Sequence, residues 1–164
     1  MAVVKQKEVV GRQVRTVQSN SPEGVRCEVS TPSPHMIITD EPAERGGTDT
    51  AASPLMHFTT SLATCQTVQI HKIAKAMRLK TGAINVEAST VTDRVAAVDG
   101  DAKVMRFIGA EMNIDIEVEG PEAKIAQLKK LSEDACPVGN IFVDAGLECT
   151  LNWNVLPVPE QAAP

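Results

Sequence analysis

The chain has 164 residues, of which 43% are hydrophobic, and this length and composition are typical of a soluble globular protein with its own core. Its net charge of -5 argues against nucleic acid as a partner, because a phosphate-binding surface needs clustered lysine and arginine. No segment approaches the roughly 18 apolar residues of a membrane span, and residues 1–7 hold no signal-peptide core, so we expect a cytoplasmic protein that does not bind membranes.

The first forty residues predict short strands. A turn pattern at Asn20–Gly24 precedes the alternating segment Val25–Val29, which is typical of a hairpin. Met36–Thr39 is a candidate for a further short strand. The loop that follows, residues 40–52, contains Pro42, Gly46 and Gly47, which argue against regular structure there.

A long helix is predicted next. Ser53 is a favourable N-cap and Pro54 suits the first helical position, and the pattern continues to about Leu79, with Gly82 just beyond. Because residues 55–65 include no charged side chain, we expect this part of the helix to be largely buried. The helix is therefore the predicted centre of the core.

Two alternating segments, residues 84–88 and 110–118, predict half-buried strands. Asp99–Gly100 lies between them and is a hairpin signal, so we expect the two strands to pair antiparallel as one long ribbon.

The C-terminal part predicts a second helix and a last strand. Pro121 opens the helix, and its inner face is expected to hold Ile125, Leu128 and Leu131. A short helix can follow at Pro137, and residues 147–155 alternate as a final strand.

This order of elements predicts an α+β fold, in which helices pack against antiparallel sheets. We expect a single domain over residues 1–156 and a flexible tail over residues 157–164.

The four cysteines contain no Cys-x-x-Cys spacing, so neither a zinc ribbon nor a thioredoxin motif is expected, and we predict no metal site. In a reducing compartment, transient or catalytic thiol chemistry is a better expectation than structural disulfides. Cys27 and Cys149 each share a strand face with apolar residues, which predicts small core residues without a function.

The other two cysteines differ from these. Cys136 directly precedes Pro137 at a predicted helix start, where unpaired N–H groups and the helix dipole favour a reactive thiolate. The alternative is a buried cysteine in an ordinary helix connection. Cys65 lies well past the first turn of its helix, and an apolar pocket there raises a thiol's pKa unless a cation or donor offsets it. Any catalytic role for Cys65 therefore requires an arginine from elsewhere.

Four segments together resemble the OsmC/Ohr family of osmotically inducible and organic hydroperoxide resistance proteins. They are Gly46–Thr50, Ser53–Pro54, Leu62–Cys65 and Cys136–Val138. The order of elements agrees along nearly the whole chain. The resemblance implies an OsmC-like α+β fold with a long central helix and a second helix, built as an intertwined homodimer with both cysteines at the subunit interface.

The resemblance also implies an activity. In the peroxidase members the helix cysteine, here Cys65, attacks a peroxide and becomes a sulfenic acid, which condenses with the second cysteine, here Cys136. Dihydrolipoyl groups, including those on a lipoylated protein, or another thiol reductant then restore the thiols, so no tightly bound cofactor is implied. The chain is thus expected to be an organic hydroperoxide reductase.

The surroundings of Cys65 suggest the kind of peroxide. Candidate substrate contacts on its helix are Leu55, His57, Phe58 and Leu62. Because an apolar pocket gains affinity by burying an alkyl tail, organic hydroperoxides are favoured over hydrogen peroxide.

The chain departs from the family pattern at Leu55, where the peroxidase members commonly carry a glutamate that pairs with the arginine beside the thiolate. Arg12 is the closest match for that arginine, and Arg15 and Arg45 are alternatives. The departure leaves a second hypothesis open, a non-catalytic member that binds an apolar small molecule or senses oxidants. A third is a stress protein whose cysteines are structural.

Overall fold

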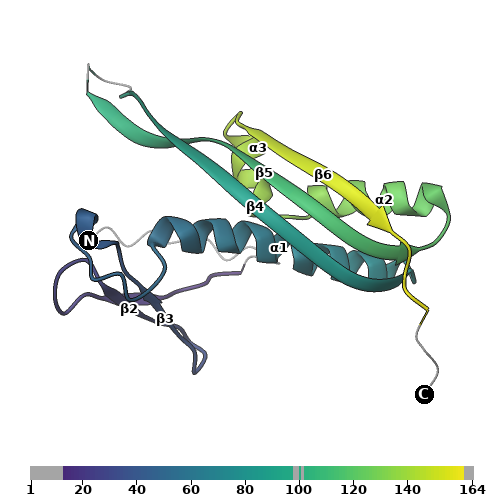
Figure 1. Cartoon of the computed structure of the whole chain (residues 1–164), viewed down its shortest axis with the longest axis horizontal. Helices are drawn as coiled ribbons and strands as arrows, with labels where there is room; N and C mark the ends of the chain where they lie inside the picture. Colours follow the sequence, from purple (N-terminus) through teal and green to yellow (C-terminus); the bar gives the residue numbers. More distant parts are fainter. Residues whose placement is uncertain (1–12, 98–99, 101, 161–164) are drawn as a thin grey trace. The chain divides into compact units, whose positions relative to one another are not determined.

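The computed structural model describes residues 13–97, 100 and 102–160, and it divides into two compact units between Pro54 and Leu55 (Figure 1). The first unit contains a three-stranded antiparallel sheet. Its strands, in the order β1-β2-β3, are β1 (Gln18–Asn20), β2 (Cys27–Ser30) and β3 (Met36–Thr39). The predicted hairpin and the strand Met36–Thr39 are confirmed, although β2 starts at Cys27 rather than at Val25.

The buried Asp40 carboxylate organises the loop that follows β3. It accepts hydrogen bonds from the Thr48 hydroxyl (2.7 Å) and the Thr50 hydroxyl (2.9 Å), and from the backbone N–H groups of Glu41 (2.8 Å), Thr48 (3.1 Å) and Thr50 (3.0 Å). These bonds, led by that of the Thr48 side chain, hold the pKa of Asp40 well below its usual range. One carboxylate therefore fixes the loop around itself.

Local backbone geometry completes this loop. A short 3-10 turn spans Ala43–Arg45, so the expectation of no regular structure here is wrong over that stretch. The turn ends at Gly46, whose φ of 84° lies in the left-handed region that glycine adopts without steric cost. A Cβ at Gly47 would collide with the carbonyl oxygen of Glu41. The two adjacent glycines are therefore required for different reasons, the first for its positive φ and the second for lack of space.

The described residues of the second unit form three strands and three helices. In chain order they are α1 (Pro54–Ala76), β4 (Lys80–Ala96), β5 (Lys103–Glu119), α2 (Glu122–Asp134), α3 (Gly139–Asp144) and β6 (Glu148–Leu156). The predicted ribbon is confirmed: β4 and β5 pair antiparallel, with Ile84 opposite Ile116, and Figure 1 shows them as one long ribbon with β6 beside β5. Gly100 has a φ of 131°, whereas Asp99 lies outside the described residues.

The expectation of purely antiparallel sheets is wrong for β6, which pairs with β5 in parallel. Between these two strands the chain runs through α2 and α3. A crossover of this length lets the chain return to the starting end of β5, which a tight hairpin turn cannot do. The second sheet is therefore mixed, and the α+β class stands.

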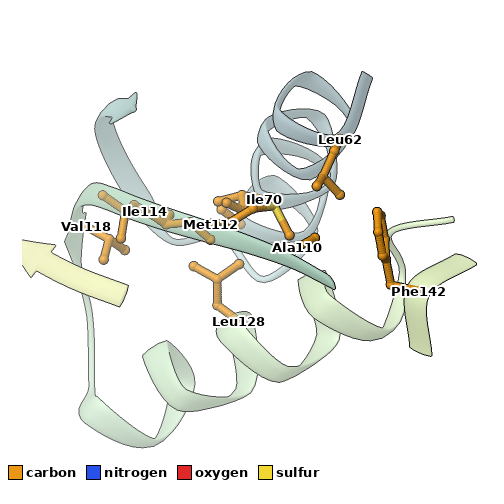
Figure 2. Packing of buried hydrophobic residues seen from close by; sticks show 10 residues of the cluster. Leu62, Ile70, Ala110, Met112, Ile114, Val118, Leu128 and Phe142 are labelled. Atoms are coloured by element: carbon orange, nitrogen blue, oxygen red, sulfur yellow. The ribbon is translucent and has the colours of Figure 1, made fainter. Parts of the chain in front are cut away.

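Both long helices cover one face of this sheet. The buried positions of β5 alternate strictly, and they are Ala110, Met112, Ile114, Ile116 and Val118. Figure 2 shows Ile70 of α1 and Leu128 of α2 directed toward this strand face, and all of these residues belong to one buried cluster. The opposite face is polar, as in the hydrogen bond from Asn152 to Asn113 (3.0 Å). The second unit therefore has two layers, the sheet and the helices that cover one of its faces. Apolar packing against the sheet stabilises the position of α1.

Helix α1 ends earlier than its sequence pattern predicts, at Ala76 instead of about Leu79. Arg78 adopts a positive φ of 57°, and the N–H groups of Arg78 and Leu79 donate to the carbonyls of Lys75 (3.1 Å) and Ala74 (3.0 Å). This pair of bonds is the Schellman arrangement, in which glycine usually occupies the left-handed position. Because Arg78 occupies the left-handed position, the helix ends before Gly82, the glycine that was expected to mark its end.

Two burial expectations are wrong. Residues 55–65 were expected to be largely buried, but Leu55 is 43% and Met56 57% exposed, because only one side of α1 meets the sheet and uncharged residues also cover the other sides. In α2, Leu128 is buried, whereas Leu131 is 39% exposed and its neighbour Ser132 is buried instead. The helix is rotated so that the small serine faces the core.

Candidate functional site

The two predicted redox cysteines lie together. Cys65 is half-buried on α1, and Cys136 is buried in the short connection between α2 and α3. The two thiols are free, and they lie close enough for Cys65 to raise the pKa of Cys136. The fold of the second unit therefore brings a dithiol together from residues that are far apart in the sequence.

The connection around Cys136 is held by backbone hydrogen bonds. The Cys136 N–H donates to the carbonyl of Glu133 (3.1 Å), and its own carbonyl accepts from the N–H of Asn140 (3.0 Å). The N–H of Gly139, the first residue of α3, donates to Cys136 Sγ (3.4 Å). The helix thus begins after Val138 rather than at Pro137, and its first N–H reaches back to the sulfur.

Of the two alternatives that the sequence left open for Cys136, the structure shows the buried cysteine. Burial is the largest cause that raises the pKa of Cys136 to about 11, and Cys65 contributes in the same direction, while the backbone of Gly139 and of Val138 lowers it. The backbone donors stabilise the thiolate less than burial destabilises it. Cys136 therefore remains protonated at neutral pH.

This difference gives the two thiols distinct roles. Cys136 is the buried thiol of the two, and its pKa is raised. Cys65 is also the more exposed of the two. The geometry suits a first reaction at Cys65 and a second at Cys136.

The four candidate substrate contacts on α1 have different surroundings. Phe58 stacks against Phe107 (ring centroids 4.8 Å apart) and Phe142 (6.0 Å), so all three phenylalanines of the chain meet in one cluster. Leu62, one turn before Cys65, is fully buried. Leu55 and His57 lie in the first turn of α1, and the carbonyl of His57 accepts a bond from the Ser61 hydroxyl (2.9 Å). Whether these four positions contact a substrate stays a prediction.

The candidate arginines belong to the first unit. Arg12 lies outside the described residues. Arg15 donates to the Gln13 side chain (2.8 Å), and Arg45 lies 3.5 Å from the Glu41 carboxylate. The identity of an arginine partner for Cys65 therefore stays a prediction.

Comparison with known families agrees with this site. The family model of OsmC-like proteins matches residues 47–152, a segment that includes both thiols and the whole of α1. The chain belongs to the OsmC-like family. A search of curated proteins found no match for it.

Solved structures share the OsmC-like fold at low sequence identity. An OsmC-like protein of unknown function from Vibrio cholerae is 9% identical, with a TM-score of 0.71, and the alignment covers 87% of this chain and 100% of that one. The OsmC-like protein from Mycoplasma pneumoniae is 16% identical (TM-score 0.67, coverage 92% and 100%). An organic hydroperoxide resistance protein from Elizabethkingia anophelis is 17% identical (TM-score 0.64, coverage 89% and 100%). These similarities establish the fold.

The other two cysteines of this OsmC-like chain differ from each other. Cys149 packs against the core cluster from β6, and burial, with a smaller contribution from the charge of Glu133, raises its pKa. Cys27 is only half-buried and donates to the carbonyl of Val25 (3.5 Å), so the expected core position is wrong for Cys27. The surrounding sheet is too small to enclose it.

Sequence reasoning missed a polar residue beside the thiols. Gln66 follows Cys65 on α1 and is fully buried, and it lines a pocket of about 200 Å³ together with Cys136. Its position was visible in the sequence, because Leu62, Gln66, Ile70 and Ala74 recur every fourth residue and form the buried stripe of α1. A glutamine in such a stripe is an exception that identifies a polar feature in the core.

Two further observations concern the described residues only. None of their helices is both long and apolar enough to cross a membrane. Within the same part of the chain, no group of three or more histidine, cysteine, aspartate or glutamate side chains is arranged to hold a metal ion.

Proposed function

We propose that this OsmC-like protein is a thiol-dependent peroxidase that reduces organic hydroperoxides, with Cys65 as the attacking and Cys136 as the resolving cysteine. The observation that carries the proposal is the proximity of a half-buried Cys65 to a buried Cys136, whose pKa Cys65 raises. Resolution requires a second thiol next to the oxidised sulfur, and that thiol is already in place.

In the proposed cycle, atoms and electrons balance with the two thiols, one hydroperoxide and one dithiol reductant. The Cys65 thiolate attacks the outer oxygen of the hydroperoxide, the O–O bond breaks, and the alkoxide leaves as an alcohol after taking a proton. Cys65 is then a sulfenic acid. The Cys136 sulfur attacks it, an S–S bond forms, and the hydroxyl group leaves as water with the proton that Cys136 carried. A dithiol such as a dihydrolipoyl group returns two electrons and restores both thiols.

The charge of Cys65 bears on the second step. A Cys65 thiolate raises the pKa of Cys136, and conversion of that thiolate into a neutral sulfenic acid removes the contribution. Cys136 is therefore a better nucleophile after Cys65 has been oxidised than before. This order protects the resolving thiol until it is needed.

The apolar surroundings support an organic substrate. Phe58 and Leu62 lie on α1 within two turns before Cys65, and neither is charged. A hydroperoxide with an alkyl or aryl tail gains affinity from apolar contact that hydrogen peroxide does not. We therefore propose that cumene hydroperoxide is a better substrate than hydrogen peroxide.

A homodimer is part of the proposal. The second unit exposes large apolar side chains, among them Met105 (57%) and Val143 (61%), and exposed apolar surface of this kind favours association. A second copy of the chain is the partner that the family resemblance implies. Light scattering coupled to size exclusion at micromolar concentration tests this, and a monomer at every concentration contradicts it.

The decisive experiment measures consumption of cumene hydroperoxide with dihydrolipoamide as the donor. We expect Cys65→Ser to abolish turnover and Cys136→Ser to allow a single oxidation without sustained turnover. Cys27→Ser is the matched control, because Cys27 belongs to the first unit, and it should keep full activity. Unchanged turnover in Cys65→Ser would overturn the proposal.

The second candidate is a non-catalytic protein that binds an apolar molecule or senses oxidants, and Leu55 favours it because the usual glutamate is absent. Treatment with one equivalent of hydroperoxide distinguishes the peroxidase from the non-catalytic protein. Rapid loss of two thiols per chain, with a Cys65–Cys136 link found by mass spectrometry, supports the enzyme. Slow loss or none supports the binding protein.

A further inference from the structure

The face of the β4-β5-β6 sheet that the helices leave uncovered contains a hollow of about 360 Å³. All three strands of this sheet contribute to its lining. The lining residues used below, called the outer hollow, are Val91, Ile108, Gly109, Glu111, Glu148 and Thr150. A hollow of this volume is large enough to hold one long side chain of a partner.

A β-bulge places an apolar side chain in the outer hollow. The pairing of β4 with β5 passes from Val91 opposite Gly109 to Thr92 opposite Phe107, so Ile108 is an extra residue. The bulge lets Phe107 turn to the helix side, where it stacks on Phe58. Ile108 is 42% and Val91 51% exposed, and both line the hollow. The hollow therefore has apolar walls on a mainly polar sheet face.

The charge of this sheet face is negative. Residues 83–91, 109–117 and 148–156 of the three strands contain no lysine, arginine or histidine. Their carboxylates alternate with the side chains that face the helices, so they lie on the uncovered face, and they are Glu87, Glu111, Asp115, Glu117 and Glu148. Such a face attracts cations and repels anions.

Two of these carboxylates line the outer hollow and are held in place. Glu111 Oε1 accepts a hydrogen bond from Asn152 Nδ2 (2.7 Å), and Glu148 Oε1 accepts one from the Thr150 hydroxyl (3.0 Å). Neither carboxylate forms an ion pair with a described residue. Because Glu148 lies opposite Gly109 and Thr150 opposite Glu111, the two carboxylates are diagonal neighbours on adjacent strands. Their charges are therefore oriented together but not neutralised.

The combination of apolar walls and two carboxylates defines the occupant. A metal ion gains nothing from Val91 and Ile108, and a purely apolar group leaves both carboxylates without a partner. An arginine side chain has an apolar stem and a planar cationic head with five N–H donors. Such a head can bond two carboxylates at once, whereas the compact ammonium of lysine is a more strongly hydrated point charge.

We propose that the outer hollow is a docking site for an arginine side chain carried by a basic segment of another protein. The stem packs on Val91 and Ile108, and the guanidinium donates to Glu111 and Glu148. Docking there uses no cysteine and no redox step. The site therefore goes beyond the proposed peroxidase activity and can be tested separately.

The test is a titration of the ¹⁵N-labelled full chain followed by NMR. The probe is the capped peptide acetyl-Gly-Ala-Arg-Ala-Gly-amide, and its matched form carries citrulline, which has the shape of arginine without the charge. We expect the arginine peptide to shift the backbone N–H signals of Gly109 and Thr150, with a Kd on the order of 1–10 mM at low salt. Citrulline should bind about tenfold more weakly, and salt should weaken the arginine peptide because the carboxylates are exposed.

Variants identify the carboxylates responsible. Glu111→Gln and Glu148→Gln should each weaken the arginine peptide about threefold, as is typical of an exposed ion pair. Glu87→Gln is the matched control, because it removes the same charge from the same face and Glu87 does not line the hollow. Cys65→Ser should bind the peptide normally while it loses the proposed turnover, so the two proposals can fail independently.

Four results would overturn the inference. The first is the absence of a saturable shift at Gly109 and Thr150 up to tens of millimolar peptide, and the second is equal binding of the citrulline form. The third is an equal loss of binding in Glu87→Gln and Glu148→Gln, which would mean diffuse attraction to the whole face. The fourth is a shift of the same signals with protein concentration alone, which would mean that a second copy of the chain covers the hollow. The wild-type titration decides the question even if a variant does not fold.

Discussion

The N–H of Gly139 donates to Cys136 Sγ over 3.4 Å, and yet Cys136 is the thiol that ionises with difficulty. The bond orients the sulfur at the start of α3, while burial sets its protonation. A buried, protonated thiol reacts slowly with oxidants in solution, which suits the resolving role that we propose for Cys136.

The raised pKa of Cys136 predicts a distinctive pH profile. Alkylation of Cys136 by iodoacetamide should be slow at pH 7 and should keep increasing up to the region of pH 11, because only the thiolate reacts. In Cys65→Ser the contributions of Cys65 disappear, so the profile should move to lower pH. Peptide-resolved mass spectrometry measures both, and a profile that levels off below pH 8 would contradict the assignment.

Replacement of Leu55 tests the role of the missing carboxylate. Leu55 is 43% exposed, so Leu55→Glu should fold normally. If an arginine of the first unit serves Cys65, the new glutamate should orient it and raise kcat/KM for cumene hydroperoxide about tenfold, equivalent to about 1.4 kcal/mol of barrier. Met56→Glu, at the next position, which is also exposed, is the control. Equal effects in both variants would reject a specific role for position 55.

The Asp40 carboxylate predicts acid sensitivity of the first unit. Because its folded pKa is depressed, its contribution to stability is complete above the ordinary pKa of 3.8 and is lost as the pH falls below that value. Asp40→Asn should therefore lower the unfolding temperature at pH 7, and the difference from the wild type should shrink below pH 4. Asp49→Asn, at an exposed position in the same loop, should change little. Differential scanning calorimetry across pH 3–7 tests this.

The end of α1 offers a stabilising substitution. Arg78 holds a left-handed conformation that costs a residue with a Cβ about 1 kcal/mol. Arg78→Gly should raise the free energy of unfolding by about 0.5–1 kcal/mol, whereas Arg78→Ala removes the charge without relieving the backbone. Urea denaturation compares the two variants, and an equal effect would mean that charge rather than conformation matters.

Local patterns predicted much of this fold. The ribbon of β4 and β5 followed from strict alternation, and the start of α1 followed from Ser53 and Pro54, since both depend on short-range sequence preferences. The parallel pairing of β6 could not be predicted in this way. It depends on where a long crossover returns, and no residue of β6 itself records that direction.

The candidate site, like the fold, could be predicted from the sequence only in part. The pairing of Cys65 and Cys136 came from the family resemblance, and the structure places them together. For Cys136 the sequence left both a reactive thiolate and a buried cysteine open, because the helix N–H is a local feature whereas burial depends on the three-dimensional fold. Gln66 was missed because its significance depends on the lack of a partner, which only three-dimensional contacts reveal.

The position of Cys65 within α1 has a consequence for the pace of the proposed cycle. Cys65 and Cys136 lie near each other on packed elements while both thiols are reduced. Oxidised and reduced chains should then show nearly the same amide hydrogen exchange along α1. The chain would alternate between its two redox states without a conformational step to limit its rate.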